Sequence, residues 1–242
     1  SAGRDIAGLT LLLPKAAQLV AGRDIRTIRY SGQNLRSGDL TLFDAGRDFR
    51  LEGQSNAIEV GGPGRVDLLA GRAVDLGISK GLTTVGRLVN SEITDERGAD
   101  LTVIAGFGQP LDATGFVAEI VGPSEDYRKE LIGFVEEQTG ATGLDYDNAA
   151  ALFAGFAAED QRPLLLKVFF SELVASGREV NKDPTLGFDR GYAAIDALLP
   201  GSRKPTATEP SPYDGDLGLA FSRIYTLGGG DISILVPGGL VN

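Results

Sequence analysis

The chain has 242 residues and a formal net charge of −10, from 33 Asp and Glu residues against 23 Lys and Arg residues. This acidic balance argues against nucleic acid or an anionic membrane surface as its partner. The absence of Cys and His excludes disulfides, thiolate zinc sites and cysteine nucleophiles, and it removes the commonest general base. No apolar run is long enough to span a bilayer, so we expect no membrane insertion.

A pentapeptide recurs along the first half of the chain. It reads Ala-Gly-Arg-Asp-Ile at 2–6 and 21–25, Ala-Gly-Arg-Asp-Phe at 45–49 and Ala-Gly-Arg-Ala-Val at 70–74. A last trace, Ala-Gly-Phe, stands at 105–107, and successive copies start 19, 24, 25 and 35 residues apart. Such periods are typical of solenoids, in which one repeat cannot bury its apolar face alone.

Short strands separated by turns are expected throughout residues 1–122. Gly, Asn, Asp or Pro punctuates the chain between short runs enriched in apolar residues, at 9–13, 25–30, 40–43, 57–60 and 66–69. These runs are too short for long helices, and the turns are too frequent for a βαβ fold. We therefore predict that residues 1–122 form coils of a parallel β-helix, each coil pairing with the next.

The charged pair inside each repeat then acquires a structural meaning. Equivalent positions of successive coils would stack about 4.8 Å apart, which places rows of Arg beside rows of Asp that compensate one another. A charged binding strip is the functional alternative, but the pair tracks the repeat, which favours a structural ladder. The glycine before the pair is expected at a corner, where positive φ or close backbone approach is needed. The ladder positions are Gly3, Arg4, Asp5, Gly22, Arg23, Asp24, Gly46, Arg47, Asp48, Gly71 and Arg72.

The composition changes at residue 123, and residues 123–200 are predicted to be helical. A first helix begins after the N-cap Ser124 and ends at Gly140, and Asp145 caps a second. A third helix has Pro163 in its first turn and ends at Gly177, and a fourth precedes Pro200. Strand-like runs then resume, so we interpret the helices as an insertion. Residues 201–242 would be a linker followed by further β-helix coils.

The helical insertion offers a candidate partner surface made of aromatic side chains. If the helices leave them exposed, these side chains could bind a receptor, a glycan or another exoprotein chain. Aromatic stripes at helical spacing more often form a core, and an insertion of this kind can also cover a solenoid edge. The residues concerned are Phe134, Phe153, Phe156 and Tyr192.

An enzyme is the third class considered, because parallel β-helices also host polysaccharide lyases and hydrolases. Asp145 with Asp147, or Asp214 with Asp216, could supply paired carboxylates. The first pair stands at a predicted helix start, where Asp caps, and the second flanks a turn glycine. No calcium-loop or phosphate-loop spacing is present, and haem ligation is disfavoured without His, Cys or Met. We expect no enzymatic activity, cofactor or metal.

Several motifs in this order resemble the distal part of large bacterial exoproteins of the filamentous haemagglutinin type. Beside the Ala-Gly-Arg-Asp repeats, they are Gly32-Gln33-Asn34, Gly61-Gly62-Pro63-Gly64, Ala70-Gly71-Arg72-Ala73-Val74-Asp75-Leu76-Gly77, Phe169-Phe170-Ser171-Glu172-Leu173 and Gly228-Gly229-Gly230-Asp231-Ile232. The similarity spans nearly the whole chain. The N-terminal secretion domain of that family is not visible here, and the chain begins inside a repeat, so we expect it to be a segment of a longer protein.

The resemblance implies export by two-partner secretion through a dedicated outer-membrane pore. It also implies a right-handed parallel β-helix that serves as an adhesin or surface fibre outside the bacterium. The expected partners are that pore together with a host cell, a glycan or another copy of the chain. The expected mechanism is mechanical and presentational, with stacked coils making a stiff rod.

Overall fold

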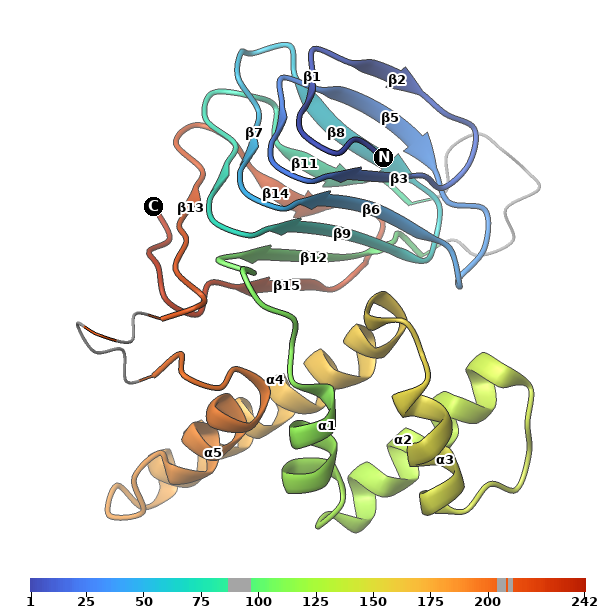
Figure 1. The fold of residues 1–242 in the computed structure, drawn as a ribbon, viewed down its shortest axis with the longest axis vertical. Coiled ribbons are helices and arrows are strands. Elements are labelled where there is room, and N and C mark those ends of the chain that lie inside the picture. Colours follow the sequence, from blue (N-terminus) through green and yellow to red (C-terminus); the bar gives the residue numbers. More distant parts are fainter. Residues whose placement is uncertain (87–96, 204–207, 209–210) are drawn as a thin grey trace. The chain divides into compact units, whose positions relative to one another are not determined.

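The computed structural model describes residues 1–86, 97–203, 208 and 211–242. The chain divides into two compact units (Figure 1). The β unit comprises Ser1–Gln109 and Pro212–Asn242, and the helical unit comprises Pro110–Ser211.

The β unit contains three parallel sheets of five strands each within the described residues. The first sheet contains β1 (Ile6–Ala7), β4 (Ile25–Arg26), β7 (Phe49–Arg50), β10 (Val74–Asp75) and β13 (Leu217–Gly218). The second contains β2 (Thr10–Leu12), β5 (Arg29–Gln33), β8 (Ala57–Gly61), β11 (Leu82–Thr84) and β14 (Ile224–Thr226). The third contains β3 (Gln18–Ala21), β6 (Leu40–Ala45), β9 (Arg65–Ala70), β12 (Asp100–Ala105) and β15 (Ile232–Leu235).

The chain visits the three sheets in turn, so each circuit adds one strand to every sheet. Because strands alternate their side chains between two faces, one set points inward from all three sheets. Inward residues such as Ile58, Leu68 and Val74 are fully buried. The rings of Tyr30 and Phe43 meet edge to face, with centroids 5.0 Å apart. This shared interior is the core of the β unit.

The repeats align in register, as their sequence predicts. Ile25 pairs with Ile6 and with Phe49, which brings the pentapeptides of successive circuits on top of one another. A Cβ added to Gly22 or Gly46 would lie 2.5 or 2.6 Å from the carbonyl oxygen of the glycine one circuit earlier. Of the two reasons expected for glycine at this corner, close backbone approach is therefore the one that applies.

The apolar run at 25–30 differs from the single strand expected there. It supplies β4 to the first sheet and β5 to the second, and the chain turns between them at Thr27, whose φ is 53°. A non-glycine residue rarely adopts this left-handed conformation, so the turn carries no recognisable sequence signal.

The break in the repeats is explained by the position of the helical unit. Ala105 pairs with Ala70, but the next strand beside Val74 is Leu217, which lies after the helices. The fifth copy of the motif is thus split between Ala105-Gly106 and Gly215-Asp216-Leu217. The chain leaves the β unit and returns to it within one corner of the repeat.

The helical unit contains six helical segments within the described residues. They are α1 (Ala113–Phe116), η1 (Val117–Val121), α2 (Glu125–Thr139), α3 (Tyr146–Ala154), α4 (Ala158–Lys182) and α5 (Asp189–Leu198). The predicted start of α2 is confirmed, since the Ser124 hydroxyl accepts a hydrogen bond from the Tyr127 amide at 3.3 Å. Its end is confirmed at Gly140, which has φ of 73°. Asp145 caps α3 by accepting from the amide of Asn148 at 2.8 Å.

Two helix boundaries differ from those expected. Residues 110–122 were assigned to the β coils, yet α1 and η1 lie there, because the Asp112 carboxylate caps α1 at the amide of Gly115. The third helix was expected to run from Pro163 to Gly177, yet α4 extends beyond both. The acidic first turn of α4 favours the earlier start through the helix dipole. A glycine within a helix costs about 1 kcal/mol, and the buried residues of α4 all precede Gly177. Beyond this glycine, Glu179 pairs with Arg190 of α5 at 2.5 Å, which favours continuation of the helix.

Candidate functional site

The Arg-Asp pairs of the repeats form a directional ladder along the β unit. Arg23 donates through Nε and Nη2 to the two carboxylate oxygens of Asp5, at 3.0 and 2.7 Å. Arg47 binds Asp24 in the same manner, at 2.7 and 2.5 Å. Arg72 binds Asp48 at 3.1 and 2.7 Å. Each arginine therefore reaches back to the aspartate one circuit earlier.

The carboxylates of the ladder also hold the backbone of the next circuit. The Asp24 amide donates to Asp5 at 3.3 Å, the Asp48 amide donates to Asp24 at 3.3 Å, and the Ala73 amide donates to Asp48 at 3.4 Å. Since each carboxylate accepts from both a guanidinium and an amide, it joins two circuits through side chain and main chain together.

Burial increases along the ladder. The exposed fractions of the Asp5, Asp24 and Asp48 side chains are 22%, 11% and 4%, while the arginines stay 40–56% exposed. Hydrogen bonding from Arg23 lowers the pKa of Asp5 to about 2, and Arg47 lowers the pKa of Asp24 in the same way. In these two pairs the hydrogen bonds from arginine therefore favour the charged form of the carboxylate.

The ladder positions that lack a partner are also informative. Among the described residues, no acidic side chain pairs with Arg4, the first arginine of the series. Ala73 replaces the fourth aspartate, and the arginine position one circuit later is occupied by Gly215. Loss of the aspartate therefore coincides with loss of the arginine that would have bound it, which supports a pairing role over a charged binding strip.

The predicted aromatic surface is only partly exposed. Phe134, Phe153 and Phe156 form a ring cluster, with centroid distances between 5.9 and 6.5 Å. Phe153 is 1% exposed, so this cluster is internal packing of the helical unit. Tyr192 lies on α5 beside Phe188 and is 43% exposed, with the Arg203 guanidinium 3.8 Å from its ring centre. The four residues do not form one surface.

Glu172 lies at the centre of a buried hydrogen-bond network that the sequence did not predict. It accepts from the Tyr127 hydroxyl at 2.6 Å and from Arg190 at 2.7 and 2.8 Å, and it thereby joins α2, α4 and α5. The bonds from Arg190 lower the pKa of Glu172, and burial with the Glu172 contact raises the pKa of Tyr127 to about 12. A glutamate among apolar residues at 169–173 signals a buried partner, but not which residue supplies it.

Two of the four carboxylates considered for catalysis, Asp145 and Asp216, make structural hydrogen bonds. Asp145 caps α3, Asp147 lies in the first turn of that helix, and Asp216 accepts from the backbone amide of Leu240 at 2.8 Å. In the described part of the chain, no group of three or more His, Cys, Asp or Glu side chains is placed to hold a metal ion. No helix in the same residues has the length and apolar character needed to cross a membrane.

Comparisons with known proteins return no match: no family model, no curated protein and no solved structure is similar to this chain.

Proposed function

We propose that the chain is a structural segment of a secreted bacterial surface fibre of the filamentous haemagglutinin type. In this proposal the β unit is a right-handed parallel β-helix that stiffens the fibre. Loops and the helical unit are then presented to partners, and no catalytic step is involved. Export would proceed through the outer-membrane pore of a two-partner secretion system.

The observation that carries this proposal is the Arg-Asp ladder. A repeat that binds its predecessor through the same side-chain and backbone contacts can be extended without limit, as a rod requires. The ladder is supported by the corner glycines, whose backbones stack too closely to admit a side chain. The Gly, Arg and Asp positions of the repeat thus all make contacts between successive circuits.

A second candidate function is specific binding by the helical unit. The acidity of the chain favours it, because residues 110–211 hold 17 acidic and nine basic side chains while the rest hold 16 and 14. A charge imbalance confined to one unit is more typical of a recognition surface than of a rod.

The location of the protein tests the fibre proposal. Antibodies raised against residues 1–242 should label intact cells of the source bacterium, and disruption of the export pore should remove the label. Labelling that appears only after the cells are permeabilised would contradict the proposal. Labelling that survives loss of the pore would contradict the proposed export route alone.

A further inference from the structure

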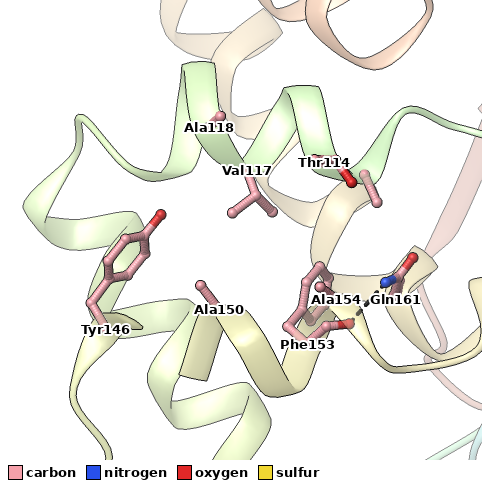
Figure 2. A pocket seen from close by; sticks show the side chains of 9 residues that line it. Thr114, Val117, Ala118, Tyr146, Ala150, Phe153, Ala154 and Gln161 are labelled. Carbon is pink, nitrogen blue, oxygen red and sulfur yellow. Dashed lines mark hydrogen bonds between the residues drawn. The ribbon is translucent and has the colours of Figure 1, made fainter. Parts of the chain in front are cut away.

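The helical unit contains an apolar groove between α1–η1 and α3. Figure 2 shows Val117 and Ala118 on one wall and Ala150 and Phe153 on the other, with Tyr146 at one end. The groove has a volume of about 280 Å³, which is close to the lower limit of ordinary ligand pockets and sufficient for one or two large apolar side chains.

The groove is held open by the residues around it. The Phe153 ring packs against the rings of Phe134 and Phe156, and the Phe153 backbone carbonyl accepts a hydrogen bond from the side-chain Nε2 of Gln161 at 2.8 Å. This bond ties the first turn of α4 to the end of α3 at the far end of the groove (Figure 2). Alanines line much of the rest, so a preformed space is available without rearrangement.

The segments that form the groove are acidic. Residues 110–124 and 145–161 contain all the lining residues and carry six carboxylates and no basic side chain. The next residue, Arg162, is buried. Glu119 and Asp147 directly follow the lining residues Ala118 and Tyr146, and both belong to exposed parts of their helices. Arg128 of α2 lies near one end of the groove, with its guanidinium 5.5 Å from the centre of the Tyr146 ring. Positive charge on a partner would therefore be favoured away from that end.

We propose that this groove binds a basic polypeptide segment, which inserts an apolar anchor side chain between α1–η1 and α3. The apolar walls supply the affinity, and the surrounding carboxylates select lysine or arginine beside the anchor. This inference goes beyond the fibre function and does not depend on it. It also relocates the partner surface, because only Phe153 among the aromatic residues singled out from the sequence lines the groove.

The test uses the full chain and a fluorescently labelled amphipathic peptide of leucine and lysine, with anisotropy as the readout. Two matched peptides replace lysine with glutamate or leucine with serine. Only the leucine–lysine peptide should bind, and its affinity should fall with added salt. Equal binding of the glutamate peptide, or no binding of the leucine–lysine peptide up to millimolar protein, would overturn the proposal.

Variants locate the binding on the protein. Ala154→Leu fills the groove and should weaken binding about ten-fold or more, since an apolar anchor loses its burial. Ala151→Leu makes the same change on an exposed face of α3 that does not line the groove. Its affinity for the peptide should therefore stay within about two-fold of that of the unmodified chain. Equal effects of the two variants would show that the peptide binds elsewhere. Asp147→Asn should weaken binding about three-fold at low salt only. An unchanged salt dependence of binding would contradict the proposed role of the carboxylates in selecting lysine or arginine.

Discussion

The pair formed by Asp48 and Arg72 gives the sharpest test of the Arg-Asp ladder. Asp48 accepts two hydrogen bonds from Arg72 and one from Arg50 at 3.0 Å, and its side chain is 4% exposed. Hydrogen bonds to charged groups contribute about 1.5–3 kcal/mol each, and the exposure of both guanidiniums reduces this. We expect Asp48→Ala to lower the free energy of unfolding by about 3 kcal/mol.

The double-mutant cycle isolates the rung itself. Arg72→Ala should cost about 1.5 kcal/mol, because Arg50 and the Ala73 amide still serve the carboxylate. The double variant should lose about 1 kcal/mol less of the free energy of unfolding than the sum of the two single losses. The measurement is urea unfolding, with the strand and helix signals of circular dichroism followed separately. Arg4→Ala is the matched control and should change stability by less than about 0.5 kcal/mol. A coupling energy below about 0.3 kcal/mol would refute the reasoning.

Three further predictions concern the corner glycines and the buried network. Gly46→Ala should destabilise the β unit by about 2 kcal/mol or more in thermal unfolding, because its Cβ would meet backbone. Gly133→Ala on α2 meets nothing and should stabilise by about 0.5–1 kcal/mol; equal effects of the two changes would contradict the stacking. Since the raised pKa of Tyr127 means that the unfolded chain ionises first, stability should fall between pH 10 and about 12, and Tyr127→Phe should reduce that fall. The lowered pKa of Glu172 predicts the reverse dependence, with stability lost as the pH drops below about 4.5. Asp5 and Asp24 contribute to the same acid loss, so Glu172→Gln should reduce it without abolishing it, and an identical acid profile would exclude Glu172 as a source.

The stacking of the repeats could be predicted because it depends on periodicity alone. A fixed motif at near-regular spacing must occupy equivalent places if the coils are to share a core, so the Gly, Arg and Asp columns follow. The direction of pairing could not be predicted in this way. Whether Arg47 reaches Asp24 or Asp48 depends on the local backbone direction and on side-chain reach, which periodicity does not contain.

The helical unit was predictable where capping chemistry is local. Ser124, Gly140 and Asp145 mark helix ends by bonds to their own neighbours. The start of α4 could not be predicted in this way, because the sequence rule places proline in the first turn of a helix whereas Pro163 lies deeper in α4. The Glu172 network was also missed, since its members are far apart in the chain and meet only through tertiary packing.

Because the chain has no cysteine, engineered disulfides can test directly whether successive repeats stack as aligned coils. Ser31 and Glu59 are register partners on β5 and β8, whereas Ala57 is paired with Arg29, two residues along. Aligned residues on neighbouring strands lie within disulfide range, and residues offset by two do not. Mild oxidation of the Ser31→Cys, Glu59→Cys double variant should give an intramolecular disulfide in nearly every molecule, while the Ser31→Cys, Ala57→Cys variant should stay reduced. Bridging of the second pair in preference to the first would contradict the coil register and the ladder that depends on it.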